Sequence, residues 1–189
     1  MAGRTSQEQT ELPAWRRGGH TDRHGIRLYK EYFNFGSAHF LIFADGSREE
    51  LHGHNYKATR ELDAPLDEAH LVADFLLVKP LFRKVCDVLD HRTLLPLRNP
   101  HLRVEADERE VTARFGPAGA DRYVVPRRDV LLLDIENTSS ELLAQWLLEA
   151  FLAELATALP TLAMDRVCVS VQESPGQSAR IERRWAVHG

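Results

Sequence analysis

The chain of 189 residues has little cysteine, since only Cys86 and Cys168 occur, each within an apolar helix or strand pattern. We therefore expect two buried free thiols and no disulfide, which favours a cytoplasmic protein. No apolar run approaches the roughly 18 residues that a membrane span needs, so no membrane association is expected. An excess of basic charge is also missing, because 24 basic and 28 acidic residues leave a net charge of -4. This balance argues against a nucleic-acid partner.

The order of local patterns predicts an α+β domain that follows a polar leader. Residues 1–25 lack an apolar period, which predicts a disordered tail, and residues 26–189 are expected to form a single domain. The expected elements are strands over 26–43 and 51–62, a helix over 72–91, an inserted hairpin with a short strand over 97–134, a helix capped by Thr138 or Ser139 in a capping box with Glu141, and strands around 167–171 and 179–186. This ββααββ order predicts an antiparallel sheet with both helices on one face.

Three of the nine histidines form a pattern that is typical of a metal site. His52 and His54 flank Gly53 in a predicted strand, so both imidazoles project from the same face. His39 lies near the end of the preceding strand and comes within reach if the two strands pair. Three imidazoles with one open position are a donor set of catalytic zinc. A surface histidine pair beside an unrelated core histidine is the alternative, and the spacing alone leaves it open.

Five short segments extend this pattern along the chain. They read S-A-H at 37–39, L-H-G-H-N-Y at 51–56, L-D-H at 89–91, E-N-T-S-S-E at 136–141 and V-Q-E-S at 171–174. In this order they resemble the 6-pyruvoyl-tetrahydropterin synthase family, which includes the 6-carboxytetrahydropterin synthases of queuosine biosynthesis. The resemblance implies the tunnelling fold (T-fold), whose subunits form a homo-oligomer, a hexamer of two stacked trimers. It also implies 7,8-dihydroneopterin triphosphate as the substrate and zinc bound by His39, His52 and His54.

The resemblance assigns roles to five further residues. Glu173 matches the pterin anchor, and a carboxylate can accept the amino group and the ring N–H of a pterin together. Asp90 and His91 match a proton-transfer pair, expected where the first helix ends because adjacent residues do not face each other within a helix. Ser139 and Ser140 match a segment that lines the pocket from a neighbouring subunit. The alternatives are an exposed glutamate at a strand end and a histidine that interacts with the helix dipole.

The sequence departs from the usual family pattern in the loop before the His-Gly-His segment. The family has a catalytic cysteine there, but residues 45–51 contain none and carry Glu49 and Glu50 instead. This arrangement resembles a subtype that has glutamate in place of the cysteine and releases 6-hydroxymethyl-7,8-dihydropterin for folate synthesis. Zinc lowers the pKa of a hydroxyl that it binds, so a carboxylate could accept the proton and a retro-aldol cleavage could follow. Glu49 is the expected base by position, with Glu50 as the second choice; two solvated carboxylates are the alternative.

Two other functions stay open at this point. A non-cysteine base could support formation of a 6-pyruvoyl- or 6-carboxy-tetrahydropterin, and product analysis separates this reaction from the cleavage. A family member could also bind a pterin or purine without turnover, which the missing cysteine favours. The retained histidines, the Asp90–His91 pair and Glu173 argue against a mere binding protein.

Overall fold

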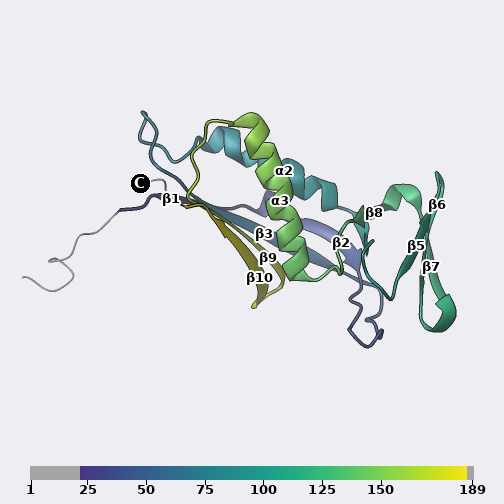
Figure 1. Ribbon diagram of the computed structural model, residues 1–189. Coiled ribbons are helices and arrows are strands. Elements are labelled where there is room, and N and C mark those ends of the chain that lie inside the picture. The colour runs from purple at the N-terminus through teal and green to yellow at the C-terminus, as the bar shows by residue number, and fades with distance from the viewer. Residues whose placement is uncertain (1–21, 187–189) are drawn as a thin grey trace, which may run out of the picture.

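Seven strands form the main sheet of the computed structural model, which describes residues 22–186 (Figure 1). The predicted tail lies almost wholly outside these residues. The sheet order is β10-β9-β3-β2-β4-β8, and β1 also pairs with β3. The strands are β1 (Gly25–Tyr29), β2 (Phe35–His39), β3 (His52–Asp63), β4 (Arg92–Pro96), β8 (Val130–Leu133), β9 (Arg166–Ser174) and β10 (Gln177–Arg184). The single strand predicted over 26–43 is thus two strands, separated by a short 3-10 helix at Glu31–Phe33.

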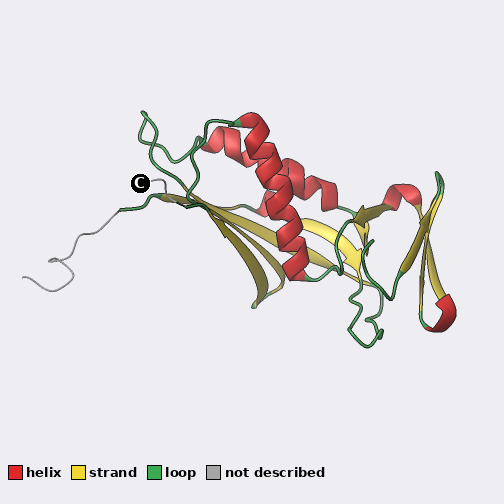
Figure 2. Ribbon diagram, in the orientation of Figure 1, coloured by secondary structure: helices red, strands yellow, loops and turns green. Residues whose placement is uncertain are grey.

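Two helices, α2 (Phe75–Leu89) and α3 (Ser140–Ala158), cover one face of this sheet (Figure 2). Asp74 caps α2 by accepting the N–H of Leu76 at 2.7 Å. Ser139 caps α3 by accepting the N–H of Leu142 at 3.4 Å, so the predicted capping box with Glu141 is wrong, because Glu141 lies one position too early. Neither helix has the length and hydropathy that a bilayer crossing requires.

A buried arginine lies at the centre of the contact between helices and sheet. Arg60 points from β3 into the core, and its guanidinium carbon lies 4.7 Å from the ring centroid of Phe33, 4.6 Å from that of Phe82 and 5.1 Å from that of Phe151. These rings come from the 3-10 helix, α2 and α3. A guanidinium held over aromatic faces gains cation–π attraction, so Arg60 links three elements to β3.

The segment between the helices contains more structure than the predicted hairpin. Strands β5 (Arg103–Ala106), β6 (Glu110–Phe115) and β7 (Asp121–Pro126) form a separate three-stranded antiparallel sheet, the inserted sheet. Strands β4 and β8 extend the main sheet, with β2 pairing β4 and β4 pairing β8 in parallel. The main sheet is therefore mixed instead of wholly antiparallel. The run at β4 holds Leu94 and Leu95, both buried, and so lacks the alternation that marks a half-exposed strand.

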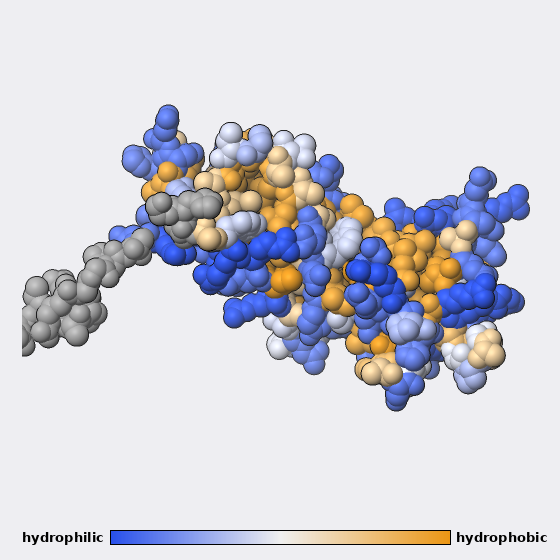
Figure 3. Space-filling view, in the orientation of Figure 1, coloured by the Kyte–Doolittle hydropathy of each residue, from blue (hydrophilic) through white to orange (hydrophobic). Residues whose placement is uncertain are grey.

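The inserted sheet packs against the loop that follows β2. One face of β6 contributes Val111, Ala113 and Phe115 to a second hydrophobic core, which also contains Phe40 and Ile42 from that loop. Figure 3 shows hydrophobic residues between the inserted sheet and the rest of the molecule, with hydrophilic residues at the outer edge. The insertion therefore supports the chain between β2 and β3.

Candidate active site

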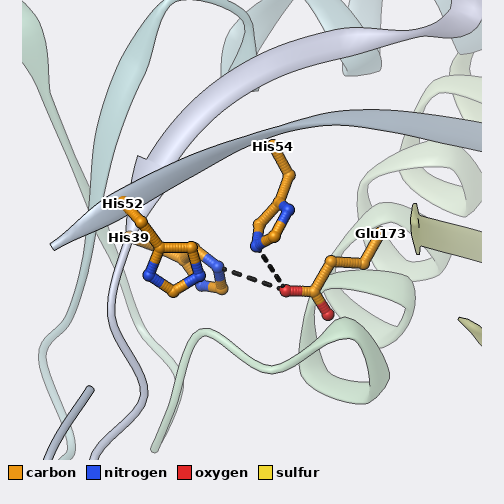
Figure 4. Close-up of side chains that lie close together, drawn as sticks. All are labelled: His39, His52, His54 and Glu173. Atoms are coloured by element: carbon orange, nitrogen blue, oxygen red, sulfur yellow. Dashed lines mark ion pairs between the residues drawn. The ribbon is translucent and has the colours of Figure 1, made fainter. Parts of the chain in front are cut away.

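Strand pairing brings the three predicted histidines together. His39 lies opposite His52 in the antiparallel β2–β3 pair, and His54 lies two residues further along β3 on the same face. Their ligand atoms and one carboxylate oxygen of Glu173 all lie within 4.8 Å of one another. Figure 4 shows the three imidazoles and Glu173 converging on one point. We call these four residues the histidine cluster.

Backbone carbonyl groups orient two of the rings. The Nδ1 atom of His39 lies 3.0 Å from the carbonyl oxygen of Thr138, and that of His52 lies 2.7 Å from the carbonyl oxygen of Glu50. A carbonyl only accepts, so these contacts place the ring proton on Nδ1 and leave the Nε2 lone pair for the cluster. Metal-binding histidines are commonly fixed in this way. Thr138 was expected only as a helix cap, because its contact with His39 depends on tertiary structure.

The surroundings of His39 favour the neutral imidazole. Burial lowers its pKa, and the nearby His52 and His54 lower it further, while the Thr138 carbonyl and Glu173 oppose this shift. The hydroxyl of Tyr56 lies 2.9 Å from Nε2 of His39. Burial raises the pKa of Tyr56, and the charges of Glu173 and Glu49 add to the effect, so the hydroxyl stays protonated. A neutral imidazole is the form that binds metal.

The donor set fits a transition-metal ion. His54 Nε2 is shielded from solvent and makes no hydrogen bond among the described residues. Its nearest charged neighbour is Glu173, whose Oε1 lies 2.7 Å away. Nitrogen atoms from three imidazoles together with a carboxylate suit zinc and related divalent ions. The structure thus supports a metal site at the histidine cluster.

Glu173, the predicted pterin anchor, lies within this cluster. It extends from the end of β9, with Oε1 also 3.5 Å from His39 Nε2, and its other oxygen accepts a hydrogen bond from Ser140 Oγ at 3.1 Å. Ser140 begins α3, while the Ser139 side chain is engaged in capping that helix. The Ser140 contact lies within one chain, whereas the resemblance implies a segment from a neighbouring subunit.

The Asp90–His91 pair follows the end of α2, where it was predicted. Asp90 accepts the N–H of Gly36 at 2.8 Å through Oδ1, and Oδ2 lies 3.0 Å from His91 Nδ1. Partial burial works to raise the pKa of Asp90, but the Gly36 N–H and His91 outweigh it and hold the pKa below its usual value. The His91 backbone has a φ of 56°, and its side chain is 89% exposed. Asp90 is therefore an ionised carboxylate that orients an accessible imidazole.

A single chain does not bring this pair to the histidine cluster. His91 lines an open hollow of about 480 Å³ together with Gly36, Gly53 and Asn55, and His54 also borders this hollow. Because side chains alternate along β3, Gly53 and Asn55 face away from His52 and His54. The hydrogen bonds and ion pairs of Asp90 and His91 within the described chain connect them to each other and to Gly36. Within the described residues, the pair thus makes no hydrogen bond or ion pair with the histidine cluster.

The two loop glutamates lie in different environments. Glu49 Oε2 accepts the N–H of Leu41 at 3.2 Å. The negative charge of Glu49 also helps to raise the pKa of Tyr56, whose hydroxyl lies beside His39. The Glu50 side chain is 90% exposed and lies 3.5 Å from Arg48. Of the two carboxylates, Glu49 is thus the one held to the chain that follows His39, while Glu50 faces solvent.

Comparison with known proteins places this arrangement in a family. The family model described as 6-pyruvoyl tetrahydropterin synthase matches residues 27–184. A Methanocaldococcus jannaschii protein with the provisional name 6-carboxy-5,6,7,8-tetrahydropterin synthase is 30% identical over 149 residues, covering 77% of this chain and 86% of that protein.

Solved structures agree with this match. The 6-pyruvoyl tetrahydropterin synthases of Plasmodium falciparum and Plasmodium vivax are 28% and 30% identical, and each aligns with a TM-score of 0.80 over 87% of this chain and 100% of its own. Another Plasmodium vivax structure, 29% identical with the same TM-score and coverage, is a variant in which a catalytic glutamate is replaced by alanine. These alignments confirm the predicted tunnelling fold. The chain belongs to the 6-pyruvoyl tetrahydropterin synthase family.

Proposed function

We propose that this protein is a zinc-dependent lyase that cleaves 7,8-dihydroneopterin triphosphate and releases 6-hydroxymethyl-7,8-dihydropterin. The observation that carries the proposal is Glu49, whose carboxylate accepts the N–H of Leu41, two residues after His39, in a loop without cysteine. Family membership supports a pterin substrate. The catalytic glutamate of the Plasmodium vivax relative supports a glutamate in the place of the usual cysteine.

His39, His52 and His54 are the residues that would hold zinc. The ion, when bound, polarises a hydroxyl on the side chain of the substrate and lowers its pKa. Glu173 would anchor the pterin, because its carboxylate can accept two neighbouring N–H groups, and Ser140 already orients one of its oxygens.

The cleavage balances with protein groups alone as proton carriers. Glu49 accepts the proton of the second side-chain hydroxyl, the bond between the first and second side-chain carbons breaks, and the second carbon becomes an aldehyde. The electron pair moves to the first carbon and the conjugated ring, and a returned proton completes the hydroxymethyl group. The other product is a two-carbon aldehyde that carries the triphosphate. His91, held by Asp90, is the proposed proton donor.

The location of His91 supports an active site shared between chains. Within the described chain, Asp90 and His91 make no hydrogen bond or ion pair with the histidine cluster, so a second copy would supply this pair to the site. The outer edges of β10 and β8 also offer unpaired strand groups that association can cover. We therefore propose a homo-oligomer, and by family resemblance a hexamer.

A specific observation favours 6-carboxytetrahydropterin synthesis as the second candidate. The Methanocaldococcus jannaschii relative carries that name, as does a Pyrococcus horikoshii protein that is 28% identical over 59% of this chain. The two candidates share the substrate and differ in the product.

Product analysis tests the proposal. The zinc-loaded protein is incubated with 7,8-dihydroneopterin triphosphate, and the pterins are identified by liquid chromatography with mass spectrometry. We expect 6-hydroxymethyl-7,8-dihydropterin as the main product. A 6-carboxy- or 6-pyruvoyl-tetrahydropterin would establish the alternative reaction, and binding without turnover would establish a non-catalytic role.

A further inference from the structure

Arg48 connects the loop that carries Glu49 to the inserted sheet. Its guanidinium carbon lies 4.2 Å from the ring centroid of Phe115 and 5.3 Å from that of Tyr123. Phe115 ends β6 and Tyr123 lies in β7, so both rings belong to the inserted sheet. Phe40, which follows β2, lies 5.9 Å from the same carbon. Arginine stacks well on aromatic faces, so these rings form a platform for the guanidinium.

The same side chain turns back to the backbone of Glu49. Arg48 Nη1 donates to the Glu49 carbonyl oxygen at 2.7 Å. Glu49 in turn donates its N–H to the Leu41 carbonyl at 3.0 Å, and its carboxylate accepts the Leu41 N–H at 3.2 Å. Within the described chain, Leu41 and Arg48 are the hydrogen-bonding partners of the Glu49 backbone. Arg48 therefore supplies the hydrogen bond that holds the carbonyl group of Glu49.

The turn pairs Ile42 with Arg48 in an isolated antiparallel bridge, but it leaves the Glu49 carbonyl to the Arg48 side chain. Its hydrogen bonds join Phe43 to Ser47 at 2.7 Å and Gly46 to Phe43 at 2.9 Å, all before Glu49. On the other side of Glu49, the carbonyl of Glu50 accepts from His52 Nδ1 at 2.7 Å. A shift of the chain at Glu49 would consequently reach both the proposed base and the orientation of a histidine in the cluster.

We propose that Arg48 is a positioning residue, through which the inserted sheet holds Glu49 at the histidine cluster. The proposal rests on the proposed function for the catalytic role of Glu49, but the contacts of Arg48 stand independently of it. A displacement of about 1 Å can reduce a catalysed rate by about 100-fold, so the loss of this support has a measurable effect.

Kinetic variants test the effect on turnover. Arg48→Met keeps the aliphatic stem and removes both the stacking and the bond to Glu49, and we expect kcat to fall by about 10-fold or more with zinc retained and KM little changed. Arg48→Lys keeps the charge over the rings but cannot present the planar fork, so its kcat is expected to lie between parent and Arg48→Met. Phe115→Leu should also lower kcat. In the double variant Arg48→Met with Phe115→Leu, the loss of kcat should be smaller than the two single losses combined. Arg103→Met, whose side chain is 77% exposed on the inserted sheet, is the control.

Hydrogen exchange tests the positioning without reference to activity. Amides of residues 41–51 should exchange faster in Arg48→Met than in Arg103→Met, in zinc-free and zinc-loaded protein alike. Equal exchange in the two variants would overturn the proposal. A kcat of Arg48→Met equal to that of an active parent protein would overturn it as well. A parent that shows no pterin turnover would refute the proposed function, while the exchange comparison would still decide whether Arg48 positions the loop.

Discussion

Replacement of Glu173 by glutamine distinguishes between two roles for this residue, as a metal ligand and as the pterin anchor. The carboxylate lies 2.7 Å from His54 Nε2, among side chains that could hold a metal ion, and it also matches the pterin anchor of the family. If Glu173 anchors the pterin, the Glu173→Gln amide presents a donor where the ligand presents donors. The loss of one charge-assisted hydrogen bond costs about 1.5–3 kcal/mol. At about 1.4 kcal/mol for each tenfold change, KM should rise by roughly 10- to 150-fold.

Zinc content and KM, measured on the same preparations, decide between the roles. For the anchor role we expect one zinc per subunit to be retained while KM rises. Glu154→Gln is the matched control, because its side chain is 27% exposed against 25% for Glu173 and it pairs with Lys84 between the helices. An unchanged KM would remove Glu173 from the pterin pocket, and a loss of zinc with the substitution would make it a metal ligand instead.

Three further predictions follow from the site. The double variant His52→Ala with His54→Ala should lower bound zinc from one per subunit to near zero in metal analysis, and retained zinc would contradict the ligand assignment. Light scattering at micromolar concentration should give the mass of an oligomer, and a strictly monomeric mass would contradict a shared active site. Thr138→Val should lower the free energy of unfolding by about 1–3 kcal/mol in urea denaturation, because the Phe40 carbonyl loses the hydroxyl that donates to it at 3.1 Å. Unchanged stability would show that this hydroxyl contributes little.

The convergence of the histidines was predictable because it depends on local rules. Alternation along a strand places His52 and His54 on one face, and a hairpin between neighbouring strands brings His39 opposite His52. The position of the Asp90–His91 pair followed from the end of an amphipathic helix. These features need only the periodicity of single elements and the pairing of sequential strands.

The remaining features depend on contacts that periodicity does not encode. Strands β4 and β8 pair in parallel with strands that are distant in sequence, and the buried pair Leu94 and Leu95 gives no alternation. The contact of Thr138 with His39 joins residues 99 positions apart. The proximity of Glu173 to His54 likewise requires β9 to pair with β3. Family resemblance supplied a role for Glu173, but the structure was needed to place it beside the histidines.

The most direct test of the central claim compares the two loop glutamates in the zinc-loaded protein. Glu49→Gln keeps the shape of the side chain and removes its basicity, and we expect release of 6-hydroxymethyl-7,8-dihydropterin to slow by about 100-fold or more with zinc retained. Glu50→Gln should have much less effect, because that side chain is 90% exposed. Inactivity of Glu50→Gln with full activity of Glu49→Gln would reverse the assignment. Full activity of both variants would contradict the glutamate mechanism and leave His91 with Asp90 as the base.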